Sequence, residues 1–345
     1  MKQTSGIFNG IVNKIPFLYT KRLKKDASRK FTLSHSILDR RTPVWKPLML
    51  LAPGLTLIIL FTIIPMLYNI VNSLTTSTGS FTLGNYVTVF TDQDFAVGVR
   101  NSFIYGIFVL PITMTISLSV SSVIAKLYRK SAQGFWQSVF FMPYITNVVA
   151  VSLVFIQVFS PAGLFNGIFG GNTDWLNSND KFTFNALFPM VGNGVWSGLA
   201  FNILIYTTAM LGVDKNLYRS ASIDGCSEFR QFFSITLPSI KSTINFLITF
   251  GIIGGLKVFP LALFNNQPAL ALKNGGASLM LYVYYTTTTG KLALSGAASI
   301  ALFIVGVTYS SIVRGGFFMA QLTLNNLGER NVWVKVKNSE QVSKK

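Results

Sequence analysis

The stretch P-L-M-L-L-A-P-G-L-T-L-I-I-L-F-T-I-I-P-M-L-Y-N-I-V, from Pro47 to Val71, decides the fold class of this chain. None of its side chains is charged. A helix rises about 1.5 Å per residue, so about 20 mostly apolar residues cross the roughly 30 Å hydrocarbon core of a bilayer. The stretch is long enough for that, and it predicts a membrane-spanning helix.

Five further segments have the same character, and none of them contains Asp or Glu. Prolines and glycines inside them, such as Pro111 and Gly255, suit membrane helices, where kinks and close backbone approach are tolerated. The sequence therefore predicts an all-α integral membrane protein with six transmembrane helices. We expect the spans at about residues 47–71, 102–125, 136–159, 186–212, 242–264 and 293–313.

Composition excludes several other classes of protein. Half of the 345 residues are hydrophobic and 12% are charged, about half the charged fraction of an ordinary soluble domain. The net charge of +18 could indicate nucleic-acid binding, but basic nucleic-acid binders do not also contain several apolar runs of this length. One cysteine, Cys226, and one histidine, His35, offer no disulfide and no metal-ligand cluster. We expect no cofactor, no metal and no catalytic residue.

The positive charges predict the orientation of the spans, because cytoplasmic segments are enriched in Lys and Arg. With the N-terminus inside, 24 of the 29 Lys and Arg residues lie in cytoplasmic segments and four lie in outer loops. The remaining one, Lys257, falls within the fifth span. Both termini are therefore expected in the cytoplasm.

This orientation divides the chain into segments. Residues 1–46 form a basic cytoplasmic tail, 47–315 the transmembrane domain and 316–345 a cytoplasmic C-terminal tail. Residues 213–241 form a cytoplasmic loop between the fourth and fifth spans. In the N-terminal tail, apolar residues between Ile7 and Tyr19 fit one face of a short helix on the anionic inner leaflet, or the tail is a disordered anchor.

The cytoplasmic loop predicts two short helices joined by a tight turn. Asp214 is a candidate N-cap for the first helix. Asp224-Gly225 is a strong turn signal, because glycine adopts positive φ at no steric cost. Ser227 or Asp224 can cap the second helix.

The second helix of the loop has one apolar face. Phe229, Phe232 and Phe233 recur at helical spacing, and Pro238 favours a stop or kink before the next span. Such an amphipathic pair either docks into a groove of a partner or lies on the lipid headgroups.

The stretch L-Y-R-S-A-S-I-D-G-C-S-E-F-R-Q-F-F-S-I-T-L-P, from Leu217 to Pro238, resembles the cytoplasmic signature of binding-protein-dependent ABC importer permeases. That signature runs approximately L-Y-E-A-A-x-I-D-G-A…F…I-T-L-P. Ser220 and Cys226 replace alanines, and Arg219 stands where the family has glutamate. The matching residues are Leu217, Tyr218, Ala221, Ile223, Asp224, Gly225, Phe232, Ile235, Thr236, Leu237 and Pro238.

Other parts of the chain are similar to the carbohydrate-uptake branch of that family, near the first permease of maltose-type and glycerol-phosphate-type systems. The resemblance covers about residues 47–315. The similar motifs are F-F-M-P (140–143), G-L-F-N (163–166), D-W-L (174–176), G-G-L-K-V-F-P (254–260), N-G-G-A-S (274–278) and G-A-A-S-I (296–300).

The resemblance implies a permease subunit of an ATP-driven importer in the cell membrane, with the translocation path for a sugar or sugar derivative. Its implied partners are a second permease subunit, two cytoplasmic ATPase subunits, an extracellular solute-binding protein and membrane lipid. The loop between the fourth and fifth spans would be the coupling helix-turn-helix that contacts an ATPase subunit. The contact residues would be Leu217, Tyr218, Arg219, Ser220, Ala221, Ile223, Asp224, Gly225, Phe229, Phe232 and Pro238.

Lys257 is the one charged residue inside a predicted span, and such residues indicate function by default. It either lines a watery cavity or extends toward the outer interface. With Phe259 and Asn265 it is the predicted substrate path, because the family has that region at the centre. The alternative function is a stand-alone ion-coupled carrier or channel, which would work without an ATPase.

Overall fold

The structure, a computed structural model, describes residues 45–76 and 79–343. Those residues are helical and contain no strand, only an isolated bridge between Thr75 and Phe81, which confirms the all-α expectation. The tail segment Ile7–Tyr19 and His35 lie outside the described residues. The longer helices are α2 (Trp45–Ile58), α3 (Ile64–Ser73), α4 (Gly84–Thr91), α5 (Gln93–Ala125), α6 (Lys130–Ile145), α7 (Val148–Val158), α9 (Leu187–Leu211), α10 (Lys215–Ile223), α13 (Lys241–Leu256), α15 (Leu279–Thr288) and α16 (Leu292–Ser343).

Shorter helical turns connect these helices. They are α8 (Leu164–Phe169), α11 (Glu228–Gln231), α12 (Leu237–Ser239), α14 (Pro268–Lys273), the π-helical segments η2 (Ile59–Ile63) and η3 (Phe232–Thr236), and the 3-10 segment η4 (Pro260–Phe264).

Five helical segments of the described residues are long and apolar enough to cross a membrane, and six are if the bent pair α6 and α7 counts as one span. These candidates are consistent with a membrane protein of several spans, and the number six stays a prediction. The five unbent candidates are Trp45–Ser73, Gln93–Ala125, Leu187–Leu211, Lys241–Phe264 and Leu292–Gly316.

The segment predicted as a third span, 136–159, is two helices rather than one straight helix. The axes of α6 and α7 differ by 86°. Thr146 and Asn147 are extended, and the Asn147 side chain accepts a hydrogen bond from the backbone N–H of Val149 at 2.8 Å. An asparagine that caps the next helix in this way competes with continuation of the previous one, and Pro143 lies in the last turn of α6.

Each π-helical segment ends two residues before a proline. In η2 the N–H of Ile64 bonds to the carbonyl of Ile59, and Pro65 follows. In η3 the N–H of Leu237 bonds to the carbonyl of Phe232, and Pro238 follows. A proline inside a helix has no N–H to donate and its ring crowds the preceding turn. One widened turn accommodates it. The helix then ends at Ser239, directly after Pro238, in agreement with the predicted stop or kink.

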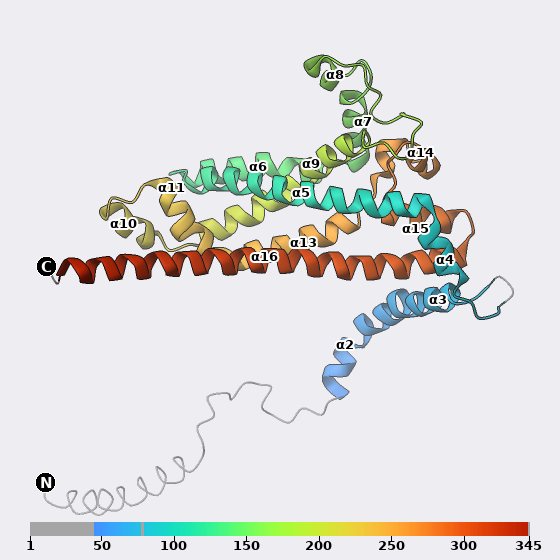
Figure 1. Cartoon of the computed structure of the whole chain (residues 1–345), viewed down its shortest axis with the longest axis horizontal. Coiled ribbons are helices and arrows are strands. Elements are labelled where there is room, and N and C mark those ends of the chain that lie inside the picture. Colours follow the sequence, from blue (N-terminus) through green and yellow to red (C-terminus); the bar gives the residue numbers. More distant parts are fainter. Residues whose placement is uncertain (1–44, 77–78, 344–345) are drawn as a thin grey trace, which may run out of the picture. The chain divides into compact units, whose positions relative to one another are not determined.

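The chain divides into two compact units, Met1–Pro65 and Met66–Lys345, and each is described by itself. The first contains α2 and η2. In the second, α5 packs along α9 and α13, and α16 packs against α4, α13 and α15 (Figure 1). Glycines permit the close contact of α5 with α13, since a Cβ on Gly255 would lie 2.9 Å from the Cα of Gly106.

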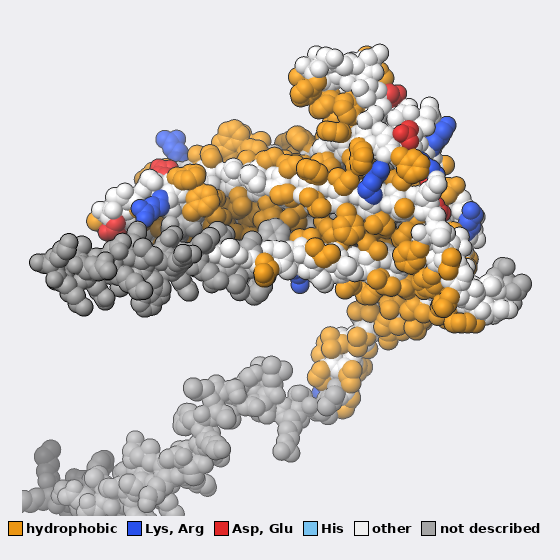
Figure 2. All heavy atoms as spheres, in the orientation of Figure 1, with side chains coloured by type: hydrophobic (Ala, Val, Ile, Leu, Met, Phe, Trp, Pro, Cys, Tyr) orange, Lys and Arg blue, Asp and Glu red, His pale blue; other side chains and the backbone are white. Residues whose placement is uncertain are grey.

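One end of the second unit is held by hydrogen bonds between segments that were predicted to be outer loops and the start of α5. The side chain of Asn101 donates to the carbonyls of Gly275 at 2.8 Å and Ala277 at 2.9 Å. The Tyr282 hydroxyl donates to Asp92 at 2.6 Å. On the visible face of this unit, acidic side chains lie toward the two ends and hydrophobic ones cover the middle (Figure 2).

Two predicted boundaries differ from the structure. The fifth predicted span, 242–264, is helical in α13 only to Leu256, and the backbone is irregular up to the 3-10 segment η4. The last predicted span, 293–313, continues without a break into the predicted C-terminal tail, because α16 extends to Ser343.

Candidate functional site

The candidate site is the loop between α9 and α13, which contains α10 and α11. Asp214 caps α10 as predicted, since its carboxylate accepts a hydrogen bond from the N–H of Asn216 at 2.9 Å. Ser227 occupies the N-cap position of α11, but its side chain makes no capping hydrogen bond. Only the first of the two short helices therefore has a side-chain cap at its N-terminus.

The turn after α10 depends on Gly225. Its φ is +72°, in the left-handed region that favours glycine. The N–H of Cys226 donates to the carbonyl of Ala221 at 2.9 Å, and the N–H of Gly225 donates to that of Ser222 at 3.1 Å. This pair of bonds is the Schellman motif, which satisfies carbonyls at the end of a helix. The predicted Asp224-Gly225 turn is confirmed.

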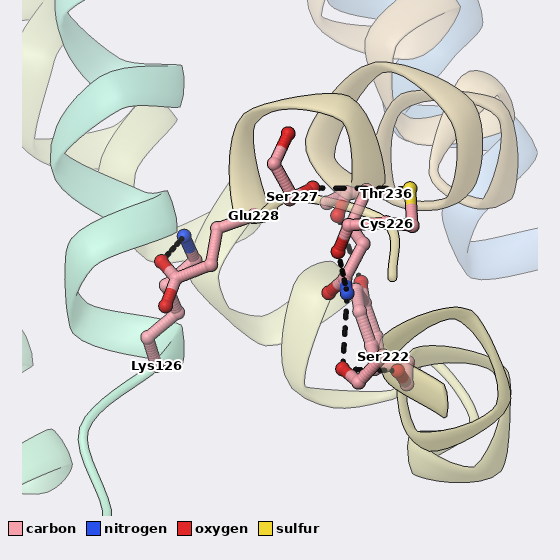
Figure 3. A network of polar contacts seen from close by, with 8 residues as sticks. Lys126, Ser222, Cys226, Ser227, Glu228 and Thr236 are labelled. Atoms are coloured by element: carbon pink, nitrogen blue, oxygen red, sulfur yellow. Dashed lines mark hydrogen bonds and ion pairs between the residues drawn. The ribbon is translucent and has the colours of Figure 1, made fainter. Parts of the chain in front are cut away.

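Polar side chains join α10 to the helix that follows the turn (Figure 3). The amide of Gln231, which is 8% exposed, donates to the hydroxyl of Ser222 at 3.1 Å and to the carbonyl of Cys226 at 2.9 Å. The hydroxyls of Tyr218 and Thr236 are 2.8 Å apart. Because buried polar groups are costly to leave unpaired, these bonds define the relative placement of the two helices.

An ion pair ties the loop to the end of α5. The ammonium of Lys126 lies 2.8 Å from a carboxylate oxygen of Glu228, as Figure 3 shows. The hydrogen bond from Lys126, together with its charge, lowers the pKa of Glu228 below the ordinary value of 4.5. Both side chains are mostly exposed, and exposed pairs contribute little to stability. The pair thus orients the loop more than it stabilises the fold.

A cavity of about 350 Å³ lies behind α10. Its walls come from the ends of α5 and α9 and from the inner face of the loop. The lining combines apolar residues with the polar groups already described. It includes Ser122, Lys126, Met210, Lys215, Tyr218, Ser222, Glu228, Gln231, Phe232 and Thr236.

The predicted contact residues divide into two sets. Ile223 is 87% exposed at the tip of α10, and Phe229 is 76% exposed beyond the turn. The other exposed members are Leu217, Arg219, Ser220, Asp224, Gly225 and Pro238. Tyr218, Ala221 and Phe232 are half-buried; Tyr218 and Phe232 line the cavity.

The residues of the predicted substrate path lie around the break after α13. Lys257 is the C-cap of α13 and its side chain is exposed. The ring of Phe259 contacts that of Tyr284 edge-on at 5.2 Å between centroids. Asn265 ends η4 with a φ of +53° and is exposed. The three residues are on one short irregular segment rather than inside a helix.

Sequence reasoning missed several residues of this region. Gln231 and the Lys126–Glu228 pair were not predicted, because their partners lie elsewhere in the chain and no spacing marks them. Arg314 was counted among the cytoplasmic positive charges that follow the last span, although it falls in the candidate span Leu292–Gly316. The number of residues after Leu292 could have indicated its depth. Among the described residues, no group of three His, Cys, Asp or Glu side chains could hold a metal ion.

Residues 117–314, which include this loop, match the family described as binding-protein-dependent transport system inner membrane component. The chain belongs to this family. It is 43% identical over 309 residues to the probable ABC transporter permease protein MG188 of Mycoplasma genitalium, covering 87% of this chain and 94% of that protein.

More distant relatives agree with this assignment. The lactose transport system permease protein LacF of Rhizobium radiobacter is 28% identical, over 79% of this chain and 93% of that protein. A permease chain of a bacterial alginate ABC transporter, solved with an alginate pentasaccharide-bound periplasmic protein, has the same fold at 20% identity. Its TM-score is 0.65, with 78% of this chain and 92% of that chain covered.

Membership of the family establishes the class of function that the resemblance predicted. The chain is the permease subunit of an ABC importer, a multi-pass membrane protein. It is a transport subunit and not an enzyme, because ATP hydrolysis in this family belongs to a separate subunit.

Proposed function

We propose that this permease subunit crosses the membrane six times, with both termini and the loop at 213–241 in the cytoplasm. The bent pair α6 and α7 forms the third crossing. The distribution of Lys and Arg supports the orientation. The ion pair Lys126–Glu228 supports the prediction that the two segments it joins lie on the same side of the membrane.

In this proposal α10 is the coupling helix that inserts into a cleft of a cytoplasmic ATPase subunit. The single observation that carries it is the exposed tip of α10 inside the family's matched region. Ile223 projects an apolar side chain that nothing in the described chain covers. An exposed apolar side chain on a rigid short helix fits a helix-in-groove contact. The half-buried set, Tyr218, Ala221 and Phe232, supports the helix from behind.

The importer assembles from this chain, a second permease subunit, two ATPase subunits, an extracellular solute-binding protein and the surrounding lipid. ATP binding favours the closed state of the ATPase pair, and that closure shifts the permeases between inward-open and outward-open states. The bonds of Gln231 and Tyr218 make the loop a unit that transmits this motion.

The transported solute is a sugar or a sugar derivative. The names of several relatives support this class: LacF is a lactose permease, and UgpA of Escherichia coli, 27% identical over 78% of this chain, is an sn-glycerol-3-phosphate permease. The solute passes the break after α13, where Phe259 offers an aromatic face and Lys257 and Asn265 offer polar groups.

Purification of the tagged chain from its native membrane tests the assembly. We expect a second permease and an ATPase to co-purify, and we expect Ile223→Asp to lose the ATPase by desolvating a charge in the contact. Ile168→Asp is the matched control, since Ile168 is 68% exposed in α8, on a predicted outer loop. Uptake of solute by the chain alone, driven by an ion gradient, would refute the proposal in favour of a stand-alone carrier.

A further inference from the structure

A groove of about 410 Å³ runs between α13 and α16. Its walls are mainly aliphatic and aromatic, and hydroxyl groups occur toward one end only. The groove is narrow at Gly306, because a Cβ there would already touch the Leu256 side chain at 3.5 Å. The lining residues are Ile252, Ile253, Leu256, Lys257, Leu302, Phe303, Gly306, Val307, Ser310, Ser311 and Arg314.

Arg314 closes one end of the groove at the depth of a membrane interface. It lies 22 residues after Leu292, about 33 Å along the helix at 1.5 Å per residue, which is close to the thickness of the hydrocarbon core. Its guanidinium donates to the hydroxyl of Thr249 on α13 at 3.0 Å. Long side chains of a helix lean toward its N-terminus, so the charge is drawn back into the groove.

No carboxylate among the described residues pairs with Arg314 or Lys257, since the ion pairs there are Lys126–Glu228 and Lys181–Asp94. A cation in a membrane span is costly unless an anion or water compensates it. Next to Arg314 the groove has the hydroxyl-bearing residues Ser310 and Ser311. The Ser311 hydroxyl already donates to the carbonyl of Val307 at 2.8 Å. The guanidinium of Arg314 is therefore the main donor available to a phosphate, with Ser310 also in the lining.

We propose that this groove binds an anionic phospholipid, with the phosphate on Arg314 and one acyl chain between α13 and α16. With the proposed orientation, the lipid belongs to the inner leaflet. Basic pockets between membrane helices on the cytoplasmic side bind acidic lipid headgroups by the same chemistry. The aliphatic walls fit an acyl chain better than a sugar, which would need polar partners along its length.

The surface around the groove also favours lipid. Phe303 is 67% exposed and Val307 51% exposed at its rim, so the groove is continuous with an apolar face. An acyl chain fills a narrow apolar slot of this kind and loses no hydrogen bond by doing so. Arg314 is thereby a headgroup-binding residue, whereas Lys257, at the other end, stays with the proposed solute path.

Lipid retention by the full complex tests this proposal. The complex is purified in mild detergent, and bound lipid is counted by native mass spectrometry after exchange with phosphatidylglycerol or phosphatidylcholine. We expect retained phosphatidylglycerol, and a loss of about five- to tenfold in its affinity for Arg314→Gln, because one interfacial cation is removed. Gly306→Leu keeps the charge and fills the slot, and it should also lose the lipid.

Two control variants each remove one positive charge, as Arg314→Gln does. Arg219→Gln changes an exposed cation outside the groove, and Lys257→Gln changes the cation at its far end; both should retain the lipid. The proposal is overturned if Arg314→Gln keeps phosphatidylglycerol, or if phosphatidylcholine binds equally well. It is also overturned if a photoreactive group at Val307 crosslinks to the second permease, because that subunit would then fill the groove. Since lipid retention is measured without ATP or solute, these outcomes are independent of the proposed transport function.

Discussion

At the scale of single residues, the loop has the glycine turn of the family signature, but one side chain has the opposite charge to its counterpart in that signature. Arg219 stands where the resembling family has glutamate, and it is exposed beside the apolar tip of α10. Nothing in the described chain pairs with it by an ion pair. A partner that keeps this contact must therefore offer an acidic side chain.

Arg219→Glu should lower ATP-driven uptake about tenfold, since like charges facing one another across an interface cost affinity. Uptake into vesicles with the native ATPase subunit measures the effect. Arg230→Glu is the matched control, because Arg230 is also exposed but lies on α11 rather than on α10. A rise in uptake for Arg219→Glu would argue against a complementary acid on the partner.

The Lys126–Glu228 pair predicts a pH dependence for the placement of the loop. The pKa of Glu228 is lowered in the folded chain, so the contact is fully present above the ordinary pKa of 4.5 and is lost as pH falls through the lowered value. A fluorophore near Glu228 should report no change between pH 8 and pH 5 and a change below that. Lys126→Gln removes the partner and should abolish this acid transition, so a fluorescence change below pH 5 that persists in Lys126→Gln would contradict the assignment.

At the scale of elements, the turn between α10 and α11 places the two short helices of the loop relative to one another. Its two Schellman bonds were predictable in outline, because Asp-Gly after a capped helix is a local signal. The bonds from Gln231 and Tyr218 were not predictable, because they depend on the angle between two helices. That angle also decides which of the predicted contact residues are exposed.

Gly225→Ala should weaken the turn by about 1–2 kcal/mol, because a Cβ is disfavoured at positive φ. We expect faster amide hydrogen exchange in the loop, because local opening becomes easier. We also expect fewer solute molecules taken up per ATP hydrolysed. Gly212→Ala is the control, as Gly212 is also a helix-end glycine but has a φ of −80°. Equal effects of the two substitutions would show that positive φ is not the cause.

At the scale of the whole molecule, the proposed orientation can be tested with the cysteine that the chain already has. Cys226 is the one cysteine in the sequence and lies, half-buried, in the loop that is proposed to be cytoplasmic. A membrane-impermeant maleimide should therefore fail to label intact cells and should label inside-out vesicles.

The opposite side is tested in the same experiment with a second variant. Asn177→Cys, combined with Cys226→Ser, places the thiol at an exposed position of the loop between α8 and α9. It should be labelled in intact cells. Labelling of Cys226 from outside would reverse the proposed orientation.

The sequence by itself determined the membrane class, the all-helical character and the short helix with its glycine turn. These depend on local properties: the length of an apolar run, the spacing of side chains along one helix and the backbone freedom of one glycine. Only the tertiary structure decided the 86° bend between α6 and α7, the inward and outward faces of α10, and the groove that Arg314 closes. Those features depend on partners such as Lys126 with Glu228 or Thr249 with Arg314, which are far apart in the chain and meet only when the helices pack.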